Sequence, residues 1–279
     1  MGTHMLKLMY ITNSTDIANI AETVGVDRIF LDMEYIGKSI RQGGMDTVQN
    51  RHTVADVKRM SQTLTRAELL VRCNPIHEAT EDYGSSAEEI DEIIEAGADV
   101  IMLPYFKTAR EVKCFLDCVG KRAKTLLLVE TTEAVECIDE ILSLDGIDEV
   151  FVGLNDLSLG YGKKFMFELL ADGTVEQLCL KFRLKGIPYG FGGIAALGKG
   201  MLPAEYVIKE HYRMGSTCAI LSRSFCNVNI IEDINTIRLI FTDGIREIRN
   251  FEKQCEEHIS YFNESRSRLL NIVHEIAHQ

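Results

Sequence analysis

The sequence predicts an α/β fold of the (β/α)₈ barrel class, and three observations point to it. Short apolar runs alternate with segments that have the spacing of amphipathic helices, eight times along the chain. The runs are rich in Val, Leu, Ile and Phe, as is typical of parallel strands buried on both faces. The chain has 279 residues, 46% of them hydrophobic, and one barrel of about 250 residues fits that length as a single domain. A doubly wound sheet remains the alternative, because alternation alone cannot close a barrel.

Capping and turn signals separate the elements of the first half of the chain. Ser14 or Thr15 can cap the first helix, Gly25 can end it, and Ser85 or Ser86 can cap the third. The expected strands are 6–11, 27–32, 68–72 and 99–104, and the expected helices are 17–24, 54–64, 85–97 and 108–119. The polar connection after the second strand is long for a link between strand and helix, and long loops at this edge tend to be functional.

The second half begins with the clearest strand–helix–strand unit, between Thr125 and Gly162. The apolar run 124–129 ends at Glu130, helical spacing follows at 132–142, and the run 149–154 is followed by Asp156. The remaining elements are expected at 174–184 (helix), 186–194 (strand), 204–214 (helix) and 217–221 (strand). In such sheets the side chains at the open ends of the strands converge on one crevice, so the strand exits are the candidate functional positions.

Glu130 and Asp156 form a candidate site for a divalent cation. Neighbouring parallel strands lie about 4.8 Å apart, so both carboxylates can reach one ion. Two carboxylates, water and a chelating substrate are the usual ligands of Mg²⁺ or Mn²⁺. The alternative interpretation is that each carboxylate caps a helix or pairs with an arginine.

Positive and glycine-rich positions follow other strands. Gly192, Gly193 and Arg223 lie at strands seven and eight, where barrels often hold a phosphate or carboxylate. In this interpretation Gly192, Gly193 and Arg223 bind substrate. The alternative interpretation is that the glycines only relieve steric crowding and that Arg223 pairs with an acidic side chain. Lys38, Arg41 and Arg51, in the long loop after strand two, also suggest an anionic ligand, with plain solvent exposure as the alternative. 

Charge and cysteine usage limit the partners and the compartment. The formal net charge is −12 and the sequence has no basic block, which argues against nucleic acid and anionic membranes. There is no signal peptide and no apolar run near the roughly 20 residues of a membrane span. The eight cysteines contain no CxxC motif and are interpreted as reduced thiols of a cytoplasmic protein. Residues 1–5, MGTHM, resemble a vector remnant and are excluded from the fold.

A helical tail is expected to follow the barrel. The barrel is assigned to residues 6–232, and residues 233–279 carry an apolar stripe that outlasts what one barrel helix needs. The tail either packs on its own barrel or contacts another subunit. We favour the second interpretation, which makes the protein a homo-oligomer.

Five strand exits, in order, resemble those of a known family. They read FLDMEY, LVRCNP, IIEAGADVIMLP, LLLVETTEAV and GIDEVFVGLNDLSLGYG. Over about residues 6–225 the chain resembles the HpcH/HpaI aldolase family of the citrate lyase β and malyl-CoA lyase group. The resemblance implies a (β/α)₈ barrel, a divalent metal, and a carbon–carbon bond made or cleaved through a pyruvate-type enolate. It also implies dimers that exchange the last helix and assemble further, for example into hexamers.

The resemblance also implies roles for individual residues. It assigns the metal to Glu130 and Asp156 and the developing enolate to Arg72, whose alternative is an ion pair with an acidic neighbour. The loop that binds the substrate carboxylate through its backbone N–H groups matches Gly153, Leu154, Asn155 and Asp156. The acidic pair after strand two matches Asp32 and Glu34. Glu95 matches the acidic residue that reaches across to the base of the active site.

One position departs from the family. Members typically carry histidine directly after the acidic residue, as the presumed acid or base, and this chain has Tyr35 there. An unperturbed tyrosine, with a pKa of about 10, is a poor base at neutral pH. His52 and His77 are the other candidates for the proton-transfer group, although each more often has a surface or capping role.

The sequence therefore predicts a Mg²⁺- or Mn²⁺-dependent carbon–carbon lyase acting on a pyruvate-like 2-keto acid and an unknown aldehyde or acyl acceptor. The alternative enzyme is a condensing or phosphoenolpyruvate-using member of the same superfamily, with a citrate-like or sugar-acid product. A different class is a catalytically silent barrel that serves as a binding subunit.

Overall fold

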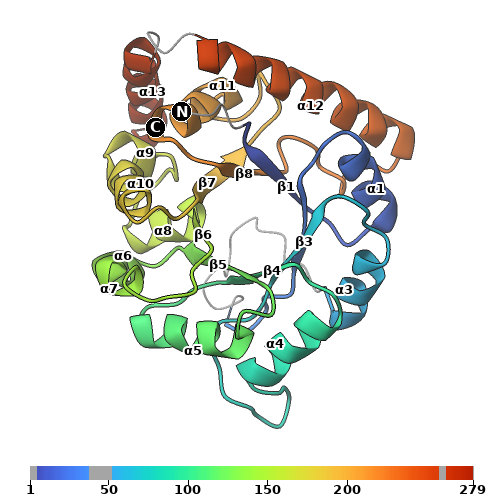
Figure 1. The fold of residues 1–279 in the computed structure, drawn as a ribbon. Coiled ribbons are helices and arrows are strands. Elements are labelled where there is room, and N and C mark those ends of the chain that lie inside the picture. Colours follow the sequence, from blue (N-terminus) through green and yellow to red (C-terminus); the bar gives the residue numbers. More distant parts are fainter. Residues whose placement is uncertain (1–4, 38–51, 258–261, 279) are drawn as a thin grey trace.

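Eight parallel strands close into one barrel in the computed structural model, which describes residues 5–37, 52–257 and 262–278 (Figure 1). Each strand pairs with its neighbour in sequence, and β8 pairs with β1 through the register Lys7–Cys218 to Tyr10–Leu221. The strands are β1 (Lys7–Ile11), β2 (Arg28–Asp32), β3 (Glu68–Arg72), β4 (Val100–Leu103), β5 (Lys124–Val129), β6 (Glu149–Val152), β7 (Tyr189–Ile194) and β8 (Cys218–Leu221). The closed order confirms the barrel and excludes the doubly wound sheet. The predictions for Lys38, Arg41 and Arg51 fall outside the described residues.

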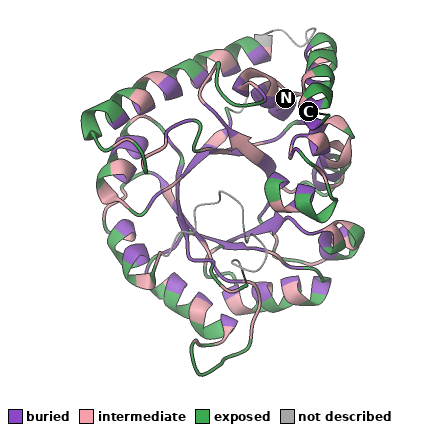
Figure 2. Cartoon of the chain, turned by 180° about the vertical axis from the view of Figure 1, so that it is seen from behind, coloured by how far each residue is buried: buried purple, intermediate pink, exposed green. Residues whose placement is uncertain are grey.

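Helices surround the barrel and turn their apolar faces toward it (Figure 2). They are α1 (Thr15–Thr23), α3 (Val54–Ser61), α4 (Ser86–Glu95), α5 (Ala109–Val119), α6 (Thr132–Glu136), α7 (Ile138–Ile141), α8 (Leu154–Gly160), α9 (Glu168–Ala171), α10 (Thr174–Leu184) and α11 (Ala204–Met214). Thr53, Ser85 and Thr108 each begin a helix with a reciprocal capping box. Two expectations were wrong in detail: the helix at 132–142 is two short helices that meet at Cys137, and the loop after β6 is helix α8.

The interior of the barrel is filled in layers. In the middle, inward-facing apolar side chains pack together, among them Met9, Phe30, Leu70, Met102 and Phe151. These side chains leave space for a ligand only toward the ends of the barrel, because a packed layer of this kind is a core and not a pore.

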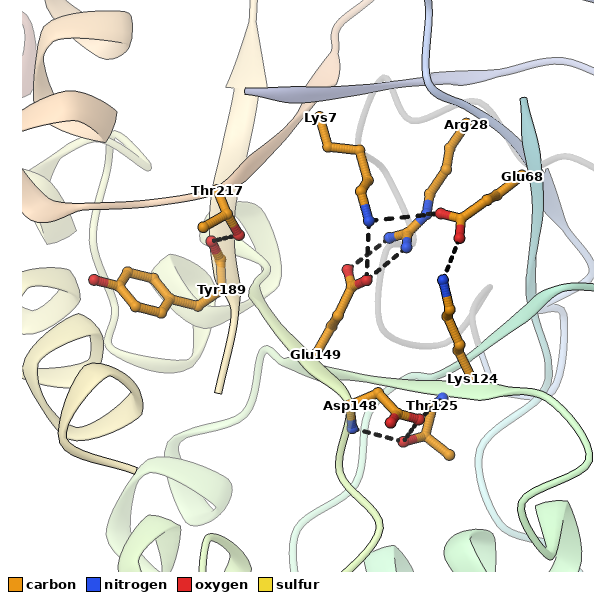
Figure 3. Close-up of polar contacts among 9 residues, drawn as sticks. All are labelled: Lys7, Arg28, Glu68, Lys124, Thr125, Asp148, Glu149, Tyr189 and Thr217. Atoms are coloured by element: carbon orange, nitrogen blue, oxygen red, sulfur yellow. Dashed lines mark hydrogen bonds and ion pairs between the residues drawn. The ribbon is translucent and has the colours of Figure 1, made fainter. Parts of the chain in front are cut away.

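An ion-pair cluster closes the end at which the strands begin (Figure 3). Arg28 is fully buried and donates to both carboxylate oxygens of Glu149, at 2.7 Å and 2.6 Å, and to Glu68 at 2.8 Å. Lys7 lies 3.2 Å from Glu149, and Lys124 pairs with Glu68. All five residues are the first residues of their strands. Charged groups therefore occupy this end, and the strand exits at the other end are left for a ligand.

The tail forms two helices that pack on their own barrel, α12 (Ile234–Glu257) and α13 (Phe262–Ala277). Helix α12 lies against α1 and α11, and α13 lies against α9 and α11 (Figure 1). Glu252 on α12 is buried and accepts hydrogen bonds from the backbone N–H of Leu6 at 2.7 Å and from the Tyr212 hydroxyl at 3.1 Å. The tail thus contributes to the fold of a single chain, and the homo-oligomer stays a prediction. Within the described residues, none of the helices has the length and apolar character needed to span a membrane.

Candidate active site

A cavity of ≈ 390 Å³ lies at the carboxyl ends of the strands. Most of the residues predicted to act in catalysis or binding line it: Asp32, His52, Arg72, Glu130, Gly153, Leu154, Asn155, Asp156, Gly192, Gly193 and Arg223. They come from β2, β3 and β7 and from the segments that follow β2, β5, β6 and β8. The convergence of strand exits expected from the sequence is therefore present in the fold.

Arg72 is held by two carboxylates from the exit of β2. Its Nε and Nη2 donate to the two oxygens of Asp32 at 2.8 Å and 2.7 Å, and Glu34 lies 3.5 Å from Nε. Burial by itself would lower the pKa of Arg72, but these carboxylates raise it above its ordinary value. The ion pair weighed as the alternative role of Arg72 is thus present, and it orients a permanently charged guanidinium at the cavity wall.

Glu130 is buried beside the same cavity and accepts a hydrogen bond from the backbone N–H of Tyr105 at 3.0 Å. Burial raises its pKa, Arg72 opposes the rise, and the charges of Glu34 and Asp156 add to it, giving a pKa of about 8. Tyr105 itself has φ 48°, a left-handed conformation that costs a non-glycine residue free energy. The backbone is therefore strained at the point where it holds Glu130.

At Gly153 and Gly192 neighbouring side chains lie so close to the backbone that a Cβ atom would clash. A Cβ on Gly153 would lie 2.9 Å from both Cβ and Oε2 of Glu130, although the φ of Gly153, −81°, suits any residue. Gly192 has φ 51°, and a Cβ there would lie 2.7 Å from the side chain of Leu154. Without side chains at these two positions, the strand exits of β6 and β7 can close around the cavity.

The expected carboxylate-binding loop is the start of helix α8. Gly153 is its N-cap, and Leu154, Asn155 and Asp156 form its first turn. The first N–H groups of a helix have no intrahelical partner, so they are available as donors at the cavity edge. The expected backbone donors are retained, in helical instead of irregular geometry.

The donor set fits a hard divalent cation. Glu130 and Asp156 supply carboxylate oxygens, which are the ligands that Mg²⁺ and Mn²⁺ prefer. In the described part of the chain, no group of three or more His, Cys, Asp or Glu side chains gathers as a metal site. A bound ion would take carboxylate oxygens from Glu130 and Asp156, and water and substrate would supply further ligands. The raised pKa of Glu130 fits this role, because a cation would offset the repulsion among the carboxylates.

Comparison with known proteins identifies the family. The model of the HpcH/HpaI aldolase/citrate lyase family matches residues 7–169, more than half of the chain. The chain belongs to this family. As a member of the HpcH/HpaI aldolase/citrate lyase family, the protein is a lyase.

Individual HpcH/HpaI relatives are distant. The hydroxypyruvate/pyruvate aldolase of Sagittula stellata is 24% identical over 190 residues, which are 58% of this chain and 67% of that protein. The hydroxypyruvate/pyruvate aldolase of Rhizorhabdus wittichii is 60% identical over 37 residues, only 13% of this chain and 15% of that protein.

Solved structures of the HpcH/HpaI family share the fold. The HpcH/HpaI aldolase from Desulfitobacterium hafniense DCB-2 superposes with a TM-score of 0.59 at 16% identity, over 88% of this chain and 93% of that one. A family protein from Burkholderia cenocepacia J2315 gives 0.58 at 13% identity, over 85% and 96%. At such identities the likeness concerns the fold alone.

Two predicted catalytic residues lie outside the cavity. Tyr35 is 53% exposed and packs edge-on against Tyr83, and its pKa is raised by partial burial and by Glu89. Glu95 is exposed at the last residue of α4, beside the end at which β4 begins. The expectation that Glu95 reaches the active site is thereby corrected for the single chain, because a helix that precedes a strand ends at the opposite end of the barrel.

The two histidine candidates differ in position. His52 lines the cavity, and its Nδ1 accepts a hydrogen bond from the backbone N–H of Asp32 at 2.9 Å. Because a backbone N–H can only donate, the neutral ring carries its proton on Nε2. The ring nitrogens of His77 lie 2.7 Å and 3.0 Å from the carbonyl oxygens of Pro75 and Gly84, so His77 organises its own loop.

The sequence analysis missed residues that position this site. The side-chain oxygen of Asn74 accepts from the backbone N–H groups of Tyr35 and Ile36, each at 2.9 Å. Glu89, in turn, accepts from the side-chain amide of Asn74 at 2.8 Å. In the sequence, Asn74 is part of the strand exit LVRCNP, and no local pattern there indicates this role. Its role depends on α4, because Glu89 on that helix accepts hydrogen bonds from the backbone N–H and the side-chain amide of Asn74.

Proposed function

We propose that the protein is a divalent-metal-dependent aldolase that makes or cleaves a carbon–carbon bond to a pyruvate-like 2-keto acid through an enolate. The observation that carries the proposal is the convergence of the Arg72 guanidinium with Glu130 and Asp156 in one cavity. Family membership supports the lyase class, and the hydroxypyruvate/pyruvate aldolase activity of the relatives supports a 2-keto acid as donor.

In this proposal Glu130 and Asp156 hold Mg²⁺ or Mn²⁺, which when bound would polarise the keto group. Arg72 stabilises the negative charge on the enolate oxygen, because its guanidinium is already oriented by Asp32 before the charge develops. The first N–H groups of α8, from Leu154 onward, bind the substrate carboxylate. Their fixed direction orients the donor carbon toward the acceptor.

Proton transfer is assigned to groups inside the cavity and not to Tyr35. Among the described residues that line the cavity, His52 is the histidine. Its Nε2–H is suited to donate a hydrogen bond to a developing oxyanion. Gly192, Gly193 and Arg223 are proposed to bind an anionic group of the acceptor, since they offer backbone approach and a positive charge at the exits of β7 and β8. The assembly is proposed to be a dimer-based homo-oligomer.

Deuterium exchange into the methyl group of pyruvate, followed by NMR with and without Mg²⁺ or Mn²⁺, tests the proposal without knowledge of the acceptor. We expect metal-dependent exchange in the wild type and its loss in Glu130→Gln and Asp156→Asn. Glu133→Gln is a matched control, because Glu133 is exposed and pairs with Lys107 outside the cavity. Absence of exchange with either metal would refute the pyruvate-enolate reaction and favour a condensing enzyme or a silent barrel.

A further inference from the structure

Two of the eight cysteines lie together on the outside of the barrel. Cys114 is exposed and Cys118 is half-buried on α5, and both are free thiols. Residues four apart on a helix share one face, so the two side chains are neighbours. The Cys118 thiol is hydrogen-bonded to the Cys114 side chain, and burial, followed by this neighbour, raises the pKa of Cys118 to about 11. The pair is therefore a dithiol that solvent can reach.

The other six cysteines are less accessible or already engaged. Cys137 is half-buried at the junction of α6 and α7, and its Sγ donates to the carbonyl oxygen of Lys107 at 3.3 Å. The remaining five are buried: Cys73, Cys179, Cys218, Cys226 and Cys255. A reagent that arrives from solvent therefore meets two neighbouring thiols at Cys114 and Cys118.

An open groove lies beside the two thiols, where α5 and α7 pack side by side (Figure 1). Both cysteines line it, and Leu144, which follows α7, supplies an apolar surface within it. The charges of Lys113 and Asp117, which also line the groove, compensate each other in an ion pair of 2.8 Å. The groove has no lining residue in common with the active-site cavity. It offers two sulfur atoms and room for an organic group at a separate place.

The spacing of the two thiols suits a bridging atom better than a disulfide. Side chains four apart on a helix have their Cβ atoms about 5–6 Å apart. A disulfide requires about 3.5–4.5 Å, so its formation would distort α5. A thiophilic atom with a bond of about 2.3 Å to each sulfur would close the gap.

The ligand set limits which atom can fill this place. Across residues 5–37, 52–257 and 262–278, no group of three or more His, Cys, Asp or Glu side chains gathers as a metal site. Structural zinc usually takes four such ligands, so a zinc ion is disfavoured at Cys114 and Cys118. The pair instead fits a soft centre that is satisfied by two sulfur ligands from the protein.

We propose that Cys114 and Cys118 chelate a trivalent organic arsenical through both sulfur atoms, with its organic group in the groove beside Leu144. In the reaction of an organic arsenoxide, two arsenic–sulfur bonds form and the bonds from arsenic to its oxygen break. The oxygen leaves as water with the two thiol protons. Arsenic stays trivalent, so no oxidant or reductant is needed. The site is independent of the proposed aldolase function.

The test is a titration of the full chain with phenylarsine oxide, followed by intact-mass spectrometry under non-denaturing conditions. It is run in excess 2-mercaptoethanol, a monothiol that removes arsenic held by a single protein sulfur. The variants are Cys114→Ser and Cys118→Ser. Cys137→Ser is the matched control, because Cys137 is also half-buried but lies outside the pair. Circular dichroism checks that each variant is folded.

We expect one adduct per wild-type chain, formed with loss of one water and persisting in excess monothiol. Cys114→Ser and Cys118→Ser should each weaken binding by about 100-fold or more, because the second sulfur no longer adds an intramolecular bond. Cys137→Ser should bind as the wild type does. Removal of the wild-type adduct by 2-mercaptoethanol, unchanged binding in either pair variant, or an equal loss in Cys137→Ser overturns the proposal.

Discussion

Removal of Arg28 is the sharpest test of how the barrel is stabilised. Arg28 is fully buried, and its bidentate partner Glu149 is only 9% exposed at the side chain (Figure 3). Breaking a buried pair by deleting one partner costs about 3–5 kcal/mol, because the other charge is left uncompensated. Lys7 remains 3.2 Å from Glu149, so the lower end of that range, about 3 kcal/mol, applies to Arg28→Met.

That loss corresponds to a Tm lower by about 6–12 °C for a domain of this size. The measurement is thermal unfolding followed by circular dichroism. Arg246→Met is the control, because Arg246 lies on α12 with its side chain 62% exposed and pairs only with nearby Asp243 among the described ion pairs, a contact worth less than about 1 kcal/mol. The double variant Arg28→Met/Glu149→Met should recover most of the stability, since apolar replacement of a whole buried pair is close to neutral.

The effect of Arg28 depends on pH in a defined direction. The pKa of Glu68 is lowered from 4.5 to about 2: burial opposes the shift, and Lys124, Arg28 and Lys7 outweigh it. A carboxyl group whose pKa is lowered in the folded state stabilises the fold at pH values above its pKa in the unfolded state. This stabilisation is lost as the pH falls toward the folded-state pKa of about 2. The Tm difference between wild type and Arg28→Met should therefore be full above pH 5 and shrink below pH 4. A Tm within 2 °C of wild type, or a double variant no better than the single, would refute this reasoning.

The remaining predictions concern the cavity and its surroundings. Gly153→Ala places a Cβ 2.9 Å from Oε2 of Glu130 and should lower kcat/KM by about 10- to 100-fold with an unchanged circular dichroism spectrum; wild-type activity would show that Glu130 can shift freely. Since the Glu130 pKa is about 8, Mg²⁺ binding at pH 7 should release about one proton, seen by calorimetry in buffers of different ionisation enthalpy. A raised carboxyl pKa also means that the folded metal-free protein loses stability as pH rises from 4.5 toward 8, and Glu130→Gln should lack this slope. Tyr35→Phe should change the rate of pyruvate exchange by less than about twofold, because Tyr35 is exposed outside the cavity; a tenfold loss would assign it a catalytic role.

Sequence reasoning located the chemistry because the rule involved is local. A parallel strand buried on both faces is a continuous apolar run, and the first polar residue after it must lie at its open end. Glu130 and Asp156 could therefore be paired before their distance in space was known, and both line the cavity. The start of α4 was predicted for the same reason, since the capping box of Ser85 links residues only three positions apart.

Other features depended on contacts that no local pattern records. Arg28 and Glu149 are 121 residues apart, and a charged residue at the start of a strand is usually a surface residue. Their pairing follows from closure of the barrel, which brings the first residues of β2 and β6 to one buried end. The orientation of Glu130 by the strained backbone of Tyr105 is likewise a consequence of how the β4 exit passes the end of β5.

The sequence by itself therefore determined the elements, their order and the residue types at the strand exits, because each is encoded within a few neighbouring residues. Only the tertiary structure decided that the sheet closes, that Glu95 lies at the far end, and that the segment 222–229 forms a cavity wall. These outcomes depend on which distant surfaces pack together. The segment 222–229, for example, packs through Phe225 against α12, where a Cβ on Gly244 would lie 2.7 Å from the Phe225 ring.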